Sequence, residues 1–152
     1  MRRKDKALPD EATADLLQRG EYGVMSTVDD KGQPYGVPLS YVFQNDCLYF
    51  HCALEGRKLD NLLSDSRVSF CVVGHTRVLP AKFSTEYESV IVIGKASVVQ
   101  GGERNEALLG LVDKYSSEFA EEGRRYIEKL DKKTTVVKIE VVKMTGKANV
   151  GS

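Results

Sequence analysis

The segment from Tyr49 to Leu62, YFHCALEGRKLDNL, places residues capable of chemistry where an apolar strand meets a short helix. His51, one of two histidines in the chain, lies at the exit of the expected strand. Arg57 and Lys58 follow Gly56 where the helix is expected to begin. A helix N-terminus carries roughly half a positive charge, so two cations there are unfavourable unless an anion binds beside them. The segment therefore predicts an anion site close to a histidine.

Phosphate is the anion that helix starts most often bind, and the arginine fork matches its geometry. Gly56 would let the backbone approach such a group closely. The glycine spacing of dinucleotide and Walker loops is missing, which favours a mononucleotide-like ligand. Its aromatic part would lie near His51, between Pro38, Leu39 and the 51–53 backbone. Spacing alone leaves open the alternative of two solvated cations and a structural histidine.

Metal binding is disfavoured by the geometry of the strand. Alternation puts Cys47, Tyr49 and His51 on one face and Cys52 on the other, so His51 and Cys52 cannot converge on one ion. Paired metal-ligand spacings such as CxxC do not occur in the sequence. The three cysteines lie in apolar segments, which is typical of reduced, buried thiols in a cytoplasmic protein.

Composition excludes several classes of protein. The 152 residues fit one domain, 1–152, with residues 1–8 as a flexible tail. Lys and Arg total 22 and Asp and Glu total 22, a balance that argues against nucleic-acid binding. The longest apolar runs, 70–73 and 90–93, are too short to cross a bilayer.

The hydrophobic pattern predicts a mainly β protein of the α+β kind. We expect six strands, largely antiparallel, and the first three should form a meander with a proline inside the second. Nearly continuous apolar strands need cover on both faces, which favours a closed or partly closed barrel with added helices. The expected strands are 22–28, 35–43, 47–52, 67–73, 89–99 and 134–144. The expected helices are 9–17, a short one carrying Leu59, Leu62 and Leu63, one around 108–115, and 119–130. A loop containing Pro80 is expected between the fourth and fifth strands.

Four stretches carry a resemblance to a known family. They are EYGVMSTVDDKGQPYGVPLSYVF (21–43), LYFHCALEGRKLDNL (48–62), RVSFCVVG (67–74) and YESVIVIGKA (87–96). In this order they resemble the FMN-binding split-barrel flavoproteins related to pyridoxamine 5'-phosphate oxidase, and most of all the 5-nitroimidazole resistance, or Nim-type, group. The resemblance implies a six-stranded split barrel, an FMN cofactor, and a homodimer with FMN at the subunit interface.

The resemblance also assigns site residues. The family grips the FMN phosphate with a Ser-Arg-Lys triplet, which Gly56-Arg57-Lys58 matches without the serine hydroxyl. Two segments would lie against the flavin: Val37, Pro38, Leu39 and Ser40 in one, and His51, Cys52 and Ala53 in the other. Ser89 stands where the oxidases have a glutamine, and residues 87–89 are candidates to reach the partner's site.

The same resemblance shapes the expected activity. The tryptophan and arginine of the oxidases' C-terminal segment have no counterpart, so oxidation of pyridoxamine phosphate is not expected. His51 matches a histidine near the flavin of Nim-type proteins and is the candidate proton donor. We expect an FMN-dependent oxidoreductase acting on small nitro-aromatic, 5-nitroimidazole-like or other electron-poor compounds. The alternative is a non-catalytic module that binds flavin, haem or deazaflavin.

Overall fold

The computed structural model describes residues 1–130 and 132–151. Its strands are β1 (Gly23–Val28), β2 (Pro34–Leu39), β3 (Val42–Gln44), β4 (Cys47–Cys52), β5 (Arg67–Leu79), β6 (Ser84–Val99) and β7 (Thr135–Asn149). Its helices are α1 (Asp10–Arg19), α2 (Arg57–Ser64), α3 (Gly101–Ser116) and α4 (Ala120–Leu130), with short 3-10 turns at Lys4–Lys6, Pro80–Lys82 and Ser117–Phe119. No helix within these ranges is long and apolar enough to cross a membrane.

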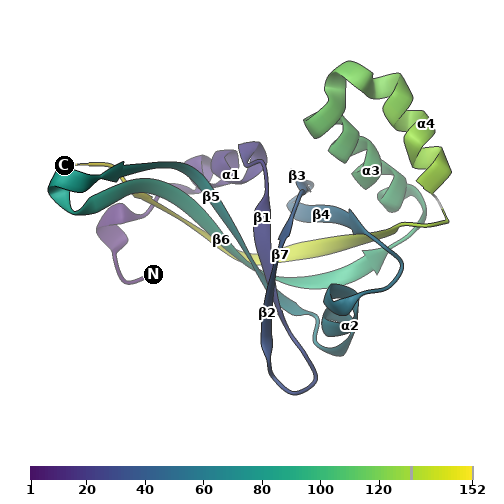
Figure 1. The fold of residues 1–152 in the computed structure, drawn as a ribbon, viewed down its shortest axis with the longest axis horizontal. Helices are drawn as coiled ribbons and strands as arrows, with labels where there is room; N and C mark the ends of the chain where they lie inside the picture. The colour runs from purple at the N-terminus through teal and green to yellow at the C-terminus, as the bar shows by residue number, and fades with distance from the viewer. Residues whose placement is uncertain (131, 152) are drawn as a thin grey trace.

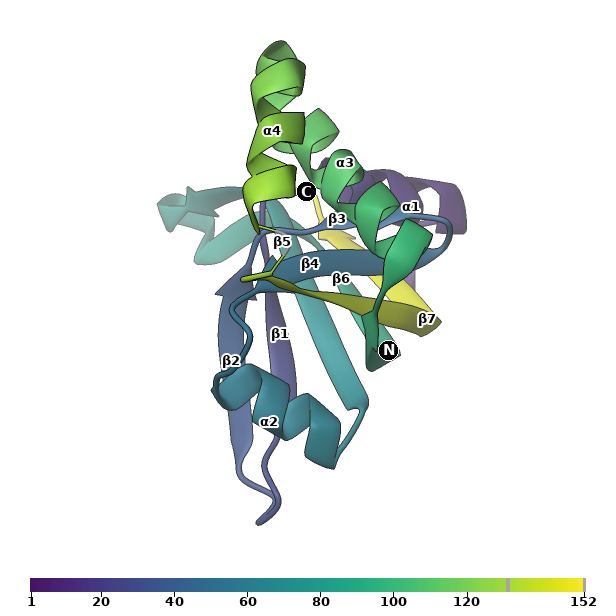
Figure 2. The same cartoon turned by 90° about the vertical axis from the view of Figure 1, so that its right-hand side faces the viewer.

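One antiparallel sheet contains seven strands in the order β2-β1-β5-β6-β7-β4-β3. The two edge strands, β2 and β3, are consecutive in the chain and are joined only by Ser40 and Tyr41. The ends of the two strands are three Cα–Cα steps apart, about 11 Å at most, so the two edges of the sheet must approach each other here. The sheet is therefore curled into a barrel that is split along this seam, as Figures 1 and 2 show. The expected split-barrel architecture is confirmed.

The seam corrects one detail of the sequence prediction. The expected strand 35–43 is two strands, which raises the count from six to seven. The expected meander is divided as well, because β2 pairs with β1 while β3 pairs with β4 on the opposite edge. Pro38 lies on an edge strand, where its missing N–H costs no ladder hydrogen bond.

A long ribbon replaces the expected loop around Pro80. β5 and β6 continue past Val73 and Ser89 and pair as far as Leu79 and Ser84. Their register shifts between Val73 and Thr76, so a bulge at Gly74 and His75 bends the ribbon without ending it. In Figure 1 this arm extends away from the barrel, on the side opposite the α3–α4 pair.

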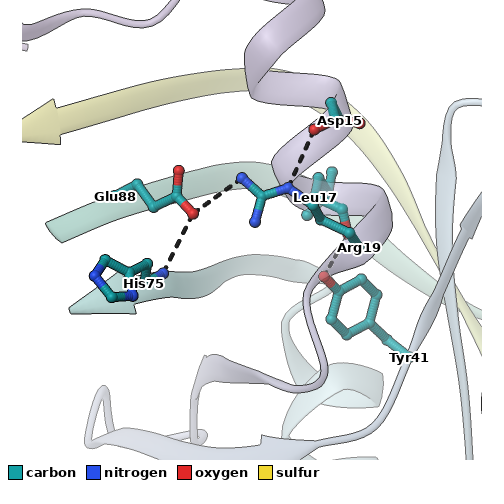
Figure 3. Close-up of polar contacts among 6 residues, drawn as sticks. All are labelled: Asp15, Leu17, Arg19, Tyr41, His75 and Glu88. Atoms are coloured by element: carbon teal, nitrogen blue, oxygen red, sulfur yellow. Dashed lines mark hydrogen bonds and ion pairs between the residues drawn. The ribbon is translucent and has the colours of Figure 1, made fainter.

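An ion-pair network holds the base of the arm to α1 (Figure 3). Arg19 bonds Asp15 at 3.1 Å and Glu88 of β6 at 2.9 Å. The same Glu88 carboxylate accepts the backbone N–H of His75 at 3.2 Å. The bulge is thereby tied to the helix through one carboxylate. The N-terminal residues, expected to be a tail, also contact this region, since the Leu8 N–H donates to the carbonyl of Gly146 on β7.

Two hydrophobic cores follow from the alternation of the strands. The main core fills the barrel and includes Phe50, Phe70 and Tyr41. The rings of Phe70 and Tyr41 meet edge-to-face, with their centres 5.0 Å apart. A second core lies between the outer face of β4 and the α3–α4 pair, with Tyr49, Leu108 and Ile127. β4 thus contributes Leu48 and Phe50 to one core and Tyr49 to the other, as its alternation predicted.

Candidate functional site

Strand β4 carries the candidate site residues His51 and Cys52 at its C-terminal end. It is held on one side by β3 and on the other by β7, where His51 pairs with Val136. His51 shares the face of Tyr49 and points away from the barrel, whereas Cys52 packs against the main core. Burial raises the pKa of the Cys52 thiol, and nearby Lys58 opposes this in part. Cys52 and Lys58 therefore lie within electrostatic reach of each other.

The start of α2 has the features of an anion cradle. Gly56 precedes it with φ of 149°, a conformation that other residues rarely adopt, and a Cβ here would meet nothing within 4 Å. No side chain caps the helix, so its first N–H groups are available to a ligand. Arg57 is exposed and Lys58 half-buried at this end. Backbone donors and two cations are brought together as the sequence predicted.

Buried contacts of α2 hold the cradle against the barrel. Leu59 and Leu62 of α2 are buried in the main core, and the buried Asn61 amide donates to the Thr27 hydroxyl at 3.0 Å. Leu63, expected on the same face, is instead 72% exposed. A helix of two turns can bury only a narrow stripe, and Asn61 takes the third buried position.

Tyr35 is a site residue that sequence reasoning missed. The Arg57 guanidinium carbon lies 4.6 Å from the centre of the Tyr35 ring, a cation–π contact between α2 and β2. The alternation of β2 places Tyr35 on the same side as Val37 and Leu39, and this shared face was the available signal. The contact fixes the direction of an otherwise exposed side chain.

Residues 37–40 form the end of β2 and the start of the junction to β3, and Ser40 lies close to His51. Val37 and Leu39 pack against the main core, while Pro38 and Ser40 are exposed. Ser40 and His51 line one hollow of about 350 Å³ under the α3–α4 pair, which we call the α3–α4 hollow. Its other walls are Leu108, Leu111, Val112, Tyr115, Ser116, Tyr126, Ile127 and Leu130. Partial loss of water around the imidazole lowers the pKa of His51.

Two further residues that sequence reasoning missed fix the seam. The Tyr115 hydroxyl of α3 donates to the carbonyl of Glu21 at 2.6 Å and accepts the N–H of Tyr41 at 3.1 Å. The Lys114 ammonium donates to the Tyr41 carbonyl at 3.0 Å and lies 3.9 Å from the centre of the Tyr41 ring. Burial lowers the pKa of Lys114 to about 8. The pattern of α3 predicted Tyr115 only as a face residue, because these partners are distant in sequence.

Ser89 lies apart from the other candidates within the chain. It is on β6, between Val73 of β5 and Lys147 of β7. It lines a different hollow, together with Ile91, Ile93 and Thr145. Among residues 1–130 and 132–151 there is no cluster of His, Cys, Asp and Glu that could hold a metal ion.

A known protein family matches most of this chain. The family model described as "Pyridoxamine 5'-phosphate oxidase" matches residues 9–148. The chain therefore belongs to the pyridoxamine 5'-phosphate oxidase family, as its resemblance indicated. Comparison with curated protein sequences finds no match.

Solved structures share the fold. A proposed 5-nitroimidazole antibiotic resistance protein from Bacteroides thetaiotaomicron is 22% identical, with a TM-score of 0.75 over 93% of this chain and 86% of that one. The conserved hypothetical protein Rv2991 from Mycobacterium tuberculosis is 18% identical, with a TM-score of 0.83 over 100% and 98%. A protein from Mycobacterium smegmatis that binds FAD and haem is 20% identical, with a TM-score of 0.79 over 96% and 74%. The fold is thus one that flavin-binding proteins use.

Proposed function

We propose that the protein binds FMN and reduces small, electron-poor compounds such as nitro-aromatics. One observation carries the proposal: the uncapped start of α2, with Arg57 and Lys58, follows within a few residues the strand end that presents His51. A phosphate at the helix start would satisfy the two cations and the unpaired N–H groups together. Membership of the pyridoxamine 5'-phosphate oxidase family supports FMN as the phosphate-bearing ligand.

The residues present suit this cofactor. Arg57 and Lys58 would hold the phosphate, and each charge-assisted hydrogen bond of this kind contributes about 1.5–3 kcal/mol. The resemblance assigns Val37, Pro38, Leu39, Ser40, Cys52 and Ala53 to the flavin, and in this proposal they would contact its ring system and side chain. When bound, FMN would supply the electron transfer, while the protein supplies orientation and electrostatics.

His51 is the proposed catalytic residue. Its lowered pKa keeps the imidazole neutral at pH 7, and a neutral imidazole still offers one N–H donor. The rate of proton transfer from this group to a substrate oxygen increases as the pH falls toward the lowered pKa. The proposed reduction should therefore be faster in mildly acidic solution than at pH 8.

Spectroscopy tests the proposal. The purified protein is incubated with FMN, separated from free flavin by gel filtration, and examined for the visible flavin band. Anaerobic mixing with NADH or NADPH should bleach this band, and a nitroimidazole should restore it. A protein that emerges without flavin would overturn the proposed binding. Flavin that binds but stays oxidised with every donor would overturn the proposed reduction.

A non-catalytic binding module is the second candidate. The similar M. smegmatis protein binds both FAD and haem, and the His51 side chain faces a largely apolar hollow, surroundings that also suit a haem ligand. Titration of the protein with haemin, with His51→Ala as the comparison, separates this candidate from the first. A histidine-ligated haem spectrum that is lost in His51→Ala would favour haem.

We further propose that two chains form a homodimer that completes the FMN site. A row of paired residues crosses five strands on the outer face of the barrel: Pro38, Val24, Cys71, Ile91 and Thr145. Ile91 is 46% exposed, and its neighbours Ile93 and Val73 are 48% and 53% exposed. An exposed apolar surface of this kind is typical of an interface between copies. Ser89 lies on the same surface, which supports its expected role in the partner's site.

A further inference from the structure

The α3–α4 hollow has a chemical character of its own. None of its ten lining residues is Asp, Glu, Lys or Arg, and seven are Leu, Val, Ile or Tyr side chains from the two helices. A neighbouring hollow that shares Ser40 and Tyr115 is different, since Arg19, Glu21 and Lys114 line it. Burying a charged group away from water and without a partner is costly. The α3–α4 hollow is therefore suited to an uncharged ligand.

Its size restricts the ligand further. A volume of about 350 Å³ is at the low end of the roughly 300–1,000 Å³ that small-molecule pockets occupy. One substituted ring fits this space, whereas the three-ring flavin system with its phosphate is too large for it.

Beside the helix hydroxyls of Tyr115, Ser116 and Tyr126, the hollow is lined by the polar side chains of His51 on β4 and of Ser40. The Tyr115 hydroxyl is already bonded to the backbone of Glu21 and Tyr41. In the part of the chain that the structure describes, the His51 imidazole has no hydrogen-bond partner, and it faces the hollow beside the Ser40 hydroxyl. A ligand that fills the apolar part would thus bring its polar substituent to these two side chains.

We propose that the α3–α4 hollow is the binding site of an uncharged, single-ring compound whose hydrogen-bond acceptor meets the His51 imidazole. The inference rests on the proposed function, for which it supplies the substrate site. It makes the α3–α4 pair the determinant of specificity, because residues of these helices form most of the wall. A negatively charged ring of the same size would be excluded.

Equilibrium dialysis tests the inference with two matched probes, 4-nitrobenzyl alcohol and 4-nitrobenzoate, which share the ring and nitro group but differ in charge. The protein is used with FMN bound and also alone, and FMN affinity is measured separately. The alcohol should bind at least tenfold more tightly than the benzoate. Equal affinity for the two probes, or no binding of the alcohol, would overturn the inference.

Two pairs of variants locate the site. Ser116→Trp fills the hollow, whereas Ser117→Trp places the same side chain one residue beyond its lining. Tyr126→Ala removes one wall, and Phe119→Ala is its control, since both residues are 59% exposed and Phe119 does not line the hollow. Affinity for the alcohol should fall at least tenfold in Ser116→Trp and severalfold in Tyr126→Ala, and stay unchanged in the controls.

The outcomes separate this inference from the proposed function. FMN affinity should be the same in all four variants, because the cradle at α2 is untouched. If the protein binds FMN but Ser116→Trp and Ser117→Trp have equal affinity for the alcohol, the result contradicts binding in the hollow and leaves the proposed FMN binding standing. Should Ser116→Trp lose its folded circular dichroism spectrum, the exposed Tyr126 and Phe119 pair decides the question.

Discussion

The Arg57 guanidinium lies over the ring of Tyr35, with its central carbon 4.6 Å from the ring centre. This contact joins the start of α2 to the edge strand β2 and fixes the direction of an exposed cation. A side chain already held in place loses less entropy when it binds an anion. The Arg57–Tyr35 contact therefore pre-organises the proposed phosphate cradle.

Tyr35→Leu should weaken FMN binding about two- to fivefold, because an exposed cation–π contact contributes roughly 0.5–1 kcal/mol. Affinity is measured by the quenching of flavin fluorescence on titration with protein. Tyr22→Leu is the control, since Tyr22 is 59% exposed and precedes β1 at the end away from Thr27, which Asn61 of α2 contacts. An affinity for FMN in Tyr35→Leu equal to that of the unaltered protein would show that the contact has no part in binding.

Tyr115→Phe should lower the free energy of unfolding by about 1–3 kcal/mol. The phenol hydroxyl satisfies the N–H of the buried Tyr41, and removing one partner of such a bond leaves that group unsatisfied. Urea denaturation measures the effect. Tyr126→Phe is a matched control, because Tyr126 is exposed and should lose little stability. Equal stability of the two variants would mean that α3 does not secure the seam.

His51 should titrate below the ordinary pKa of histidine. Its pKa is lowered in the folded protein, so between the lowered and the ordinary value the unfolded chain binds more protons. The free energy of unfolding should therefore fall as the pH is lowered through this window. Proton NMR resolves the titration because the chain has only two histidines, and His51→Gln assigns the signals. A His51 pKa at or above the ordinary value would contradict the described surroundings.

Local pattern was enough to predict most elements and the face of β4. Alternation placed Leu48 and Phe50 opposite Tyr49, and the glycine and cations at 56–58 located the start of α2. Both features depend on residues close in sequence. Local pattern predicted a closed or partly closed barrel, and the resemblance to a known family specified a split one.

The parts that were missed depend on contacts between distant residues. The break at Ser40 and Tyr41 arises because β2 and β3 join opposite edges of the sheet, and Tyr115 holds this break from 74 residues away. The sequence predicts a loop in place of the arm because its strand pattern is weak around Gly74, yet cross-strand pairing continues beyond the bulge. Tyr35 and Lys114 carry no local signal of their partners.

Ile91→Glu should dissociate the proposed homodimer. It places a charge in the middle of the apolar row, where a partner surface would leave it desolvated. Light scattering should give twice the chain's mass for the unaltered protein and the mass of one chain for the variant, together with weaker FMN binding. Leu63→Glu is the control, since Leu63 is 72% exposed on α2 and outside the row. A single-chain mass for unaltered protein that binds FMN at full strength would contradict a shared site.

The affinities of Lys58→Ala for FMN and for riboflavin test the central claim most directly. The two ligands differ by the phosphate alone, so the comparison isolates the contact that the α2 cradle is proposed to make. Loss of one charge-assisted bond should weaken FMN about ten- to a hundredfold and leave riboflavin nearly unchanged. Equal weakening of both ligands, or of neither, would contradict a phosphate site at Arg57 and Lys58.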